Sequence, residues 1–265
     1  AASDVYKRHH IDRSKLSLVE IRSHVWRDVI WINVDGAAQP FEEVMASTIK
    51  RWRELDQNLY HGGEDGKFSL KVKGNWKLAV ENYCESYHLP WIHPGLNSYS
   101  RLEDHYNIVK YGSHSGQGSL VYKQLSDEKG KTFPDFKNLS RKWATGAEYI
   151  ALYPNVLLGV HRDHAYAIIL LPLSFSETIE NVHIYYSQPD ASPSLKKKNK
   201  EQWKEIFEED IFVVEGMQAG RFGIKFDGGR FSPKMDEPTH CFHDWVASKV
   251  DNFRNQNRQI ASVTE

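Results

Sequence analysis

The chain has 265 residues, of which 40% are hydrophobic and 26% charged, and its formal net charge is -1. This length allows one large domain or two small ones, and the near-neutral charge gives no electrostatic reason to expect nucleic acid or an acidic membrane as a partner. No apolar run reaches the roughly 18 residues that span a bilayer, and no signal-peptide pattern opens the chain. The two cysteines, Cys84 and Cys241, cannot build a disulfide framework, so we expect a reducing cytoplasm.

The N-terminal part is predicted to form strands and then a helix. Residues 16–23 alternate apolar and polar side chains, and residues 25–34 are rich in β-branched and aromatic side chains before a turn signal at Asp35-Gly36. Residues 40–55 place apolar side chains at helical spacing. We therefore divide the chain into a strand region, 1–35, and a larger domain, 36–265.

The rest of the chain contains more predicted strands than helices. Strands are expected over residues 67–72, 106–111, 119–123 and 181–188, with two or three more in the segment 148–173. Helices are expected over residues 76–89, with Asn75 as the cap, over 200–220, and over 243–258. The lysine-rich residues 192–200 are expected to form a solvated loop and the start of the second of these helices. This order predicts an α+β domain with an antiparallel sheet and helices packed to one side.

The segment 75–94 contains two histidines, a carboxylate and two prolines. Glu85 and His88 are three residues apart, so they would lie on one face of the predicted helix. His88 and His93 are five apart and would point about 140° away from each other on a regular helix, so they could not share a metal. Pro90 disfavours helix at the residue before it, so the chain can turn there and bring His93 back beside His88.

A distant carboxylate could complete such a site. Asp210 lies among apolar side chains of the predicted helix 200–220, whereas Glu208 and Glu209 indicate that this helix also has a solvated face. A carboxylate on the inward face of a helix is costly unless it is paired or binds a metal. Two imidazoles and one carboxylate suit iron(II) in a facial triad, and they also suit catalytic zinc.

These two segments together resemble a known family. The matching residues are Asn75-Trp76-Lys77, Glu81-Asn82-Tyr83, Glu85, Tyr87-His88, His93-Pro94, Glu209-Asp210-Ile211, Val214-Glu215 and Gln218. The pattern resembles the catalytic domain of the α subunit of Rieske-type non-haem iron ring-hydroxylating oxygenases, over nearly the whole chain. The resemblance implies a helix-grip fold of the START/Bet v1-like kind, in which a curved antiparallel sheet carries helices on one side.

The resemblance also implies individual roles. His88, His93 and Asp210 match the ligands of a mononuclear Fe(II), and Glu85 matches the acid that links a Rieske-cluster ligand to His88. A carboxylate bonded to the outer nitrogen of His88 would fix its tautomer and orientation. The implied activity is that of a terminal oxygenase component, which uses O2 to hydroxylate or oxidatively N-demethylate a small aromatic or alkyl-ammonium substrate. The implied partners are a ferredoxin or flavin reductase as electron donor, and further copies in a homotrimer.

One departure from the family concerns the Rieske [2Fe-2S] cluster, which needs two cysteines and two histidines in close pairs. Only Cys241-Phe-His243 offers such a pair here, and Cys84 lies within the iron motif. We expect the Cys241 and His243 pair to be incidental, so this chain does not ligate the cluster. Residues 1–35 are expected to lead out of a cluster domain that would precede Ala1.

A second departure concerns the substrate. Glu85 stands where ring-hydroxylating members usually have Asp, and together with Pro94 it resembles the branch that oxidises betaines and carnitine. Tyr83, Tyr87 and Trp91 surround the ligands in sequence. They could form an aromatic cage for a quaternary ammonium group, or merely pack the helix.

Two other functions stay open, a zinc-dependent hydrolase and a metal-free helix-grip module that binds a ligand. The buried Asp210 and the geometry at Pro90 count against the second. A further histidine pair, His161 and His164, would face opposite sides of an extended strand, so a shared metal there would need a turn. Of two roles for this pair, lining the substrate pocket is favoured over binding metal.

Overall fold

The computed structural model describes residue 16 and residues 18–263, which fall into two compact units, Ala1–Ala46 and Ser47–Glu265. The division predicted after residue 35 and its link to a cluster domain stay predictions, because residues 1–15 lie outside the described part.

The first unit contains a β-hairpin. Strands β1 (Arg22–Trp26) and β2 (Val29–Asn33) pair antiparallel, and the turn consists of Arg27 and Asp28, with φ angles of 53° and 60°. Two residues at positive φ make a turn whose twist matches that of paired strands. The predicted strand boundaries are wrong, since this turn falls inside the predicted second strand. Neither turn residue is glycine or asparagine, so the sequence lacks the usual signal.

The predicted helix over residues 40–55 is present in three pieces. They are α1 (Phe41–Val44), α2 (Ala46–Arg51) and a 3-10 turn (Arg53–Leu55). Met45 separates the first two because its backbone, with φ -95° and ψ 2°, leaves helical geometry. The position of the predicted helix is confirmed, and its continuity is wrong.

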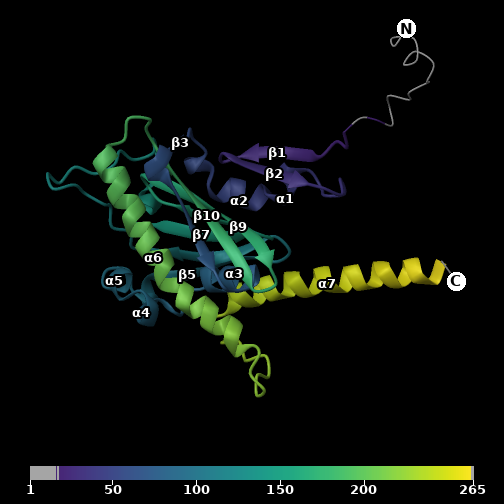
Figure 1. Cartoon of the computed structure of the whole chain (residues 1–265). Coiled ribbons are helices and arrows are strands. Elements are labelled where there is room, and N and C mark those ends of the chain that lie inside the picture. The colour runs from purple at the N-terminus through teal and green to yellow at the C-terminus, as the bar shows by residue number, and fades with distance from the viewer. Residues whose placement is uncertain (1–15, 17, 264–265) are drawn as a thin grey trace, which may run out of the picture. The chain divides into compact units, whose positions relative to one another are not determined.

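The second unit is built on one antiparallel sheet, which has eight strands within the described residues (Figure 1). The order is β3-β10-β9-β8-β7-β6-β5, and β4 also pairs with β10. Strands β6, β7 and β8 are buried along nearly their whole length. The apolar segment 148–173 indicates this for β7 and β8, whereas β6 lies outside that segment. The strands are β3 (Tyr60–His61), β4 (Lys67–Val72), β5 (His105–Lys110), β6 (His114–Ser119), β7 (Ala147–Leu152), β8 (Val156–Val160), β9 (His164–Ser174) and β10 (Glu177–Tyr186).

Strand β6 replaces the strand predicted over residues 119–123. Its two glycines indicate turns in the sequence, yet both lie inside the strand. A Cβ at Gly116 would lie 2.0 Å from the carbonyl oxygen of Tyr149, and one at Gly118 would lie 2.2 Å from the Tyr106 ring. Only glycine permits such approach, so these glycines mark close packing rather than turns.

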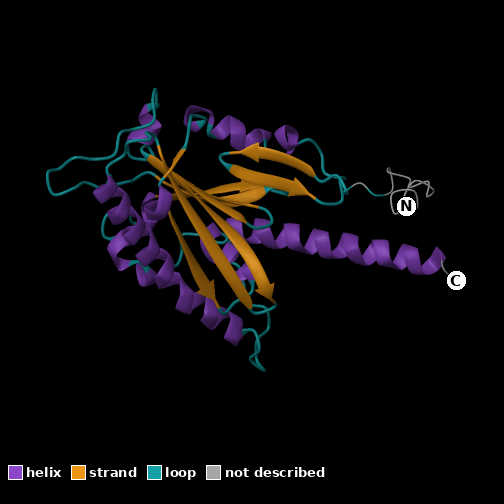
Figure 2. Ribbon diagram, turned by 45° about the horizontal axis from the view of Figure 1, so that its top comes forward, coloured by secondary structure: helices purple, strands orange, loops and turns teal. Residues whose placement is uncertain are grey.

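The helices confirm the predicted α+β class. Figure 2 shows the fanned strands of the sheet with helices beside them, and α3 contacts β7, α6 and α7. Val80 of α3 is fully buried in the same core cluster as Leu170 and Ile184 of the sheet. None of the helices in the described part is long and apolar enough to cross a membrane. The longer and site-forming helices are α3 (Trp76–Cys84), α4 (Leu89–Ile92), α5 (Pro94–Asn97), α6 (Pro193–Gly220) and α7 (Glu237–Val263).

Two predicted helix boundaries are wrong. The lysine-rich segment predicted as a loop and helix start is helical from Pro193 onward, which places the start of α6 earlier than residue 200. Pro193 occupies the first turn, where a helix needs no N–H. The helix predicted over residues 76–89 ends at Cys84. That early end decides how the candidate ligands meet.

Candidate metal centre

Side chains of α6 fix the start of α3. Asn75 is the predicted cap, and its side chain accepts a hydrogen bond from the Lys77 backbone N–H at 3.1 Å. The backbone N–H of Asn75 donates to Gln218 Oε1 at 2.8 Å, and that of Lys73 donates to Glu215 Oε1 at 3.0 Å. These bonds tie together the helix that precedes the histidines and the helix that carries Asp210.

Glu85 follows α3 and has extended backbone, with φ -118° and ψ 160°. The prediction that Glu85 and His88 share a helical face is therefore wrong. The side chain still reaches the ring, since Glu85 Oε1 lies 2.7 Å from His88 Nδ1. Its Oε2 accepts hydrogen bonds from the backbone N–H groups of Tyr87 and His88. One carboxylate thus shapes the turn and orients the histidine that ends it.

The two prolines begin short helices instead of ending a long one. Pro90 lies in the first turn of α4 and Pro94 in the first turn of α5, where a missing N–H costs nothing. The interruption assigned to Pro90 has already occurred at Glu85. His88 and His93 flank the single turn of α4, and their ring centroids are 5.1 Å apart. The structure brings the two histidines together for a different reason from the predicted one.

Helix α6 supplies two carboxylates to these rings. Asp210 Oδ1 lies 3.0 Å from His93 Nε2 and 3.6 Å from His88 Nε2. Glu209 Oε2 lies 2.7 Å from His93 Nδ1. The assignment of Glu209 to a solvated face is wrong. Successive helical residues point about 100° apart, which lets two neighbouring acids reach the two nitrogens of one imidazole.

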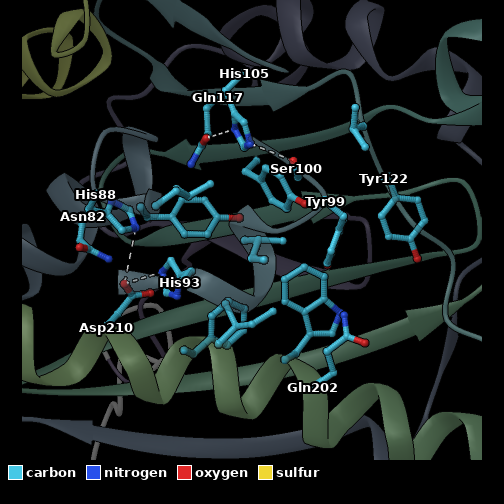
Figure 3. A pocket seen from close by; sticks show the side chains of 18 of the residues that line it. Asn82, His88, His93, Tyr99, Ser100, His105, Gln117, Tyr122, Gln202 and Asp210 are labelled. Carbon is cyan, nitrogen blue, oxygen red and sulfur yellow. Dashed lines mark hydrogen bonds and ion pairs between the residues drawn. The ribbon is translucent and has the colours of Figure 1, made fainter. Parts of the chain in front are cut away.

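Three potential ligand atoms converge in Figure 3. One nitrogen of each of His88 and His93 and one oxygen of Asp210 lie within 4.8 Å of one another, the one such group of three found among the described residues. Glu85 and Glu209 occupy both Nδ1 atoms, so each ring presents Nε2. Asp210 Oδ1 is buried and accepts no hydrogen bond from any described residue. Two nitrogens and one carboxylate oxygen make the donor set of a facial triad.

The charge around His93 favours a cation. Burial alone lowers the pKa of His93, but the carboxylates of Asp210 and Glu209 outweigh burial and raise that pKa above its ordinary value. A proton and a metal ion would compete for the same nitrogen. We therefore expect metal binding here to weaken as the solution becomes acidic.

A cavity opens beside the triad, and its wall is largely aromatic. Figure 3 shows the triad at one side of this pocket and Tyr122 and Gln202 at the other. Burial raises the pKa of Tyr83, Tyr149 and Tyr166 well above its ordinary value, so these side chains remain neutral hydroxyls. The aromatic lining residues are Tyr83, Tyr99, Tyr122, Tyr149, Tyr166, Trp203 and Phe207.

A hydrogen-bonded network forms another part of the wall. His105 Nδ1 lies 2.7 Å from Gln117 Oε1, and His105 Nε2 lies 3.0 Å from Ser100 Oγ. Gln117 Nε2 donates to the backbone oxygen of Glu85 at 3.0 Å, so the network reaches the turn before His88. No sequence pattern indicates these residues, because three separate segments supply them.

The predicted cage of Tyr83, Tyr87 and Trp91 is not assembled. Tyr83 lines the pocket, but Tyr87 and Trp91 are 48% and 67% exposed and contact each other edge to face. The pocket takes its other aromatic side chains from distant segments.

His161 and His164 lie behind the pocket wall. A turn at Arg162-Asp163 stacks their rings 4.2 Å apart. His164 Nδ1 lies 2.7 Å from Asp163 Oδ1, and its Nε2 accepts a hydrogen bond from Trp203 Nε1 at 2.9 Å, so neither nitrogen is left for a metal. The structure gives the pair neither of the two roles weighed for it, because both histidines lie beside Trp203, which lines the pocket.

Cys241 and His243 take part in packing. Cys241 is buried with its thiol directed to the His114 backbone oxygen at 3.8 Å, and His243 Nε2 lies 3.0 Å from Glu81 Oε1. Cys84 is also buried and free, and it accepts a hydrogen bond from Ser115. These contacts agree with an incidental Cys-x-His pair.

Known proteins share this architecture and sequence pattern. The family described as ring hydroxylating α subunit, catalytic domain, matches residues 59–252. Putrescine 2-hydroxylase of Bordetella bronchiseptica is 30% identical over 195 residues, which cover 64% of this chain and 42% of that protein. The carnitine monooxygenase oxygenase subunit of Escherichia coli is 23% identical over 216 residues, which cover 80% of this chain and 54% of that protein. The chain spans about half the length of the curated relatives it matches.

Solved structures confirm the predicted fold. A quaternary ammonium Rieske monooxygenase in complex with L-carnitine superposes with a TM-score of 0.72 at 19% identity, covering 94% of this chain and 66% of that one. Naphthalene 1,2-dioxygenase from Rhodococcus sp. superposes with a TM-score of 0.57 at 12% identity, covering 85% of this chain and 64% of that one.

Proposed function

Because this chain belongs to the ring-hydroxylating α-subunit family, whose catalytic domain it contains, we propose that it is the iron-bearing part of a Rieske-type oxygenase. The observation that carries the proposal is the buried Asp210 Oδ1, which has no hydrogen-bond donor among the described residues and faces two histidine nitrogens. An unpaired buried carboxylate oxygen is costly unless a cation compensates it. His88, His93 and Asp210 would be the ligands of Fe(II).

The residues fit iron(II) in donor type as well as in position. Two imidazoles and one carboxylate leave coordination positions open, and iron(II) bound there supplies the activation of dioxygen for insertion into a C–H bond. Glu85 and Glu209 hold the rings so that both Nε2 atoms face the metal. Such outer partners raise the basicity of the ligands and fix their tautomers.

The pocket supports a small alkyl-ammonium substrate. Aromatic faces attract cationic ammonium groups, and the buried tyrosines keep their hydroxyl protons, so the wall is electron-rich without being charged. Proteins similar to this chain are named for putrescine, carnitine and choline, each of which has an ammonium group. Hydroxylation of a C–H bond beside the nitrogen, followed by loss of the hydroxylated carbon, would give the N-demethylation alternative.

Electrons would come from outside this chain. Its two cysteines are separate, buried and free, so it offers no set of ligands for a [2Fe-2S] cluster. We propose that Glu85 links His88 to a cluster ligand on a neighbouring subunit of a homotrimer, reduced in turn by a ferredoxin or flavin reductase. A structurally similar protein, a quaternary ammonium Rieske monooxygenase that oxidises carnitine, is described as using inter-subunit electron transfer, which supports this arrangement.

Metal content and oxygen uptake test the proposal. The chain purified without oxygen should bind one iron(II) per molecule, and His88→Ala should abolish that binding. With a reducing system and a cluster domain added, putrescine, carnitine or choline should stimulate oxygen uptake and give a hydroxylated or demethylated product. The matched control is Ser98→Ala on the exposed end of α5, which should bind iron like the unchanged chain.

The same measurements separate the alternatives. A zinc-dependent hydrolase would retain zinc in preference to iron and would consume no oxygen. A metal-free binding module would keep its affinity for an alkyl-ammonium ligand after alanine replaces His88 and His93. Absence of iron in the unchanged chain, with no effect of His88→Ala, would overturn the proposal.

A further inference from the structure

His105 lies between two cavities. Its ring lines the pocket beside the triad and also lines a second cavity, whose other residues include the exposed Glu103, Asn107 and Lys234. Neither the metal ligands nor their carboxylate partners use this histidine. A titratable side chain that borders both a reaction pocket and a surface cavity is suited to proton transfer.

The hydrogen position at Nδ1 follows from its neighbours. Gln117 Nε2 donates to the backbone oxygen of Glu85, which can only accept. Gln117 therefore presents Oε1 to His105 Nδ1, at 2.7 Å. Because an amide oxygen cannot donate, Nδ1 carries a hydrogen.

The Nε2 side leads into a chain of two hydroxyl groups. Ser100 Oγ lies 3.0 Å from His105 Nε2 and 2.7 Å from Ser119 Oγ, and Ser119 Oγ lies 2.8 Å from the backbone oxygen of Val121. The Val121 oxygen can only accept, so Ser119 donates to it and Ser100 donates to Ser119. Nε2 must then donate to Ser100. Figure 3 shows the two hydrogen bonds of the His105 ring, to Gln117 and to Ser100. Together with the bonds of Ser119, they form at the same time only when His105 is a cation.

When His105 loses that proton, the hydrogen bonds along Nε2, Ser100 and Ser119 reverse their direction. Ser100 then donates to Nε2, Ser119 donates to Ser100, and the Val121 oxygen loses its hydroxyl donor. No heavy atom has to move, because the two states differ by one proton and the rotation of two hydroxyl groups. Ser100 itself lines the pocket, so the series of hydrogen bonds reaches the cavity that opens beside the triad.

Burial leaves the proton of cationic His105 easy to release. Burial lowers the pKa of His105 below its ordinary value, although the bond to Gln117 and the charge of Asp104 raise it, and the charge of His88 lowers it further. The titratable and charged groups that face the ring are Asp104 beside it, His88 across the pocket, Glu85 behind Gln117, and Tyr106, Glu103 and Lys234 at the second cavity.

We propose that His105 and Ser100 form a proton relay that delivers a proton from the surface cavity to the oxygenase pocket. This inference rests on the proposed function. Conversion of O2 and a C–H bond to a C–OH group and water consumes two electrons, from the external iron–sulfur donor, and two protons. Ser100 turns its hydroxyl toward the pocket and gives its proton to the oxygen that becomes water. It then takes the proton from Nε2, whose bonding electron pair stays on nitrogen, and His105 is reprotonated from the second cavity.

Nuclear magnetic resonance of the full chain tests the relay without turnover. With zinc(II) bound and histidine labelled with nitrogen-15, we expect His105 to carry hydrogens on both nitrogens at low pH and only on Nδ1 at high pH. Ser119→Ala should lower the midpoint by about 0.5 to 1 pH unit, because it removes two hydrogen bonds from the cationic state, Ser100 to Ser119 and Ser119 to the Val121 oxygen, but only one from the neutral state, Ser119 to Ser100. Ser98→Ala, an exposed hydroxyl outside the network, should not move the midpoint. A His105 that stays neutral throughout, or a midpoint unaffected by Ser119→Ala, would overturn the relay.

Turnover gives an independent readout. With O2 and a reducing system, His105→Gln should lower the rate of product formation about 100-fold, as expected for loss of a proton donor. Hydrogen peroxide already carries two electrons and two protons, so peroxide-driven product formation should be within about 2-fold of the unchanged chain. Equal losses in both assays would mean a structural role and would overturn the relay. If the unchanged chain forms no product in either assay, the proposed function fails, and the resonance titration still decides whether the relay exists.

Discussion

Two carboxylates in this protein, those of Glu148 and Asp210, have opposite surroundings. Glu148 of β7 is 0% exposed, and five donor groups of the protein point at it. Arg51 donates from Nε at 2.7 Å and from its terminal nitrogen at 2.9 Å. Trp52, Tyr106 and Lys142 add donors at 2.7, 2.8 and 2.6 Å. Both oxygens of the Glu148 carboxylate therefore accept hydrogen bonds from other side chains of the protein.

Asp210 shows the reverse pattern. Its buried Oδ1 accepts no hydrogen bond among the described residues, although histidine nitrogens lie at 3.0 and 3.6 Å. Glu85 and Glu209 contact the Nδ1 atoms of these two histidines, on the side of each ring away from Asp210. A carboxylate that stabilises the fold is satisfied by its own protein, whereas one that binds an ion leaves an oxygen for it.

The largest effect is expected at the satisfied carboxylate. Glu148→Ala should lower the free energy of unfolding by about 2–4 kcal/mol, because it removes the acceptor of the buried Trp52 Nε1–H and the partner of Arg51 and Lys142, whose side chains are 33% and 45% exposed. Urea unfolding measures this loss. A loss below about 1 kcal/mol would show that the donors rearrange and that the contrast with Asp210 is false.

The same carboxylate should also govern acid stability. Burial alone raises the pKa of Glu148, but bonds and charges from Arg51 and Lys142 outweigh it and hold that pKa below 4.5, the ordinary value. A depressed folded-state pKa gives stability that is present above the unfolded value and is lost as the pH falls through the folded one. Glu148→Gln should therefore flatten the loss of stability below pH 4.5.

A substitution of Asp210 should change the affinity for iron(II) much more than the free energy of unfolding. Asp210→Asn is expected to weaken iron(II) binding more than about 100-fold, because it removes the one anionic ligand. The metal-free protein should lose no more than about 1 kcal/mol of unfolding free energy, since no internal donor depends on this oxygen. Calorimetric titration with iron(II) under argon measures the affinity, and urea unfolding in the presence of a chelator measures the stability of the metal-free protein. Destabilisation as large as that of Glu148→Ala would make Asp210 a structural residue.

A smaller change is expected one residue earlier. Glu209→Gln should weaken iron(II) binding about 10- to 100-fold by removing the anionic partner of His93 Nδ1. Glu208→Gln is the matched control, because Glu208 only pairs with Lys204 on the exposed side of α6. Equal affinities of the two variants would show that Glu209 does not tune the ligand.

The smallest effect is expected for an exposed carboxylate. Glu177 pairs with Lys71 at 3.0 Å between two strands of the sheet, with both side chains partly in solvent. Glu177→Gln should cost less than about 1 kcal/mol of unfolding free energy, and added salt should reduce even that difference. A loss of unfolding free energy near that of Glu148→Ala would mean that burial does not determine how much a carboxylate contributes to stability.

Local sequence was enough for the elements and for the residues with ligand chemistry. Alternating and continuous apolar runs located most strands of the sheet, and residues 67–72 form a strand with the predicted bounds. The types and spacing of His88 and His93, with a single inward acid at Asp210, indicated a candidate metal site. Hydrophobic period and chain-breaking residues act over a few positions, so a sequence displays them directly.

Only the tertiary structure decided which side chains surround that site. Glu209 meets His93 across 116 positions of sequence, and Gln117 meets Glu85 across 32. The glycines of β6 indicate turns in the sequence, whereas in the structure they make room for the Tyr106 ring and a carbonyl oxygen of the neighbouring strands. Such partners are set by which faces of the sheet and helices come together. That packing depends on the whole chain, so no local pattern reveals it.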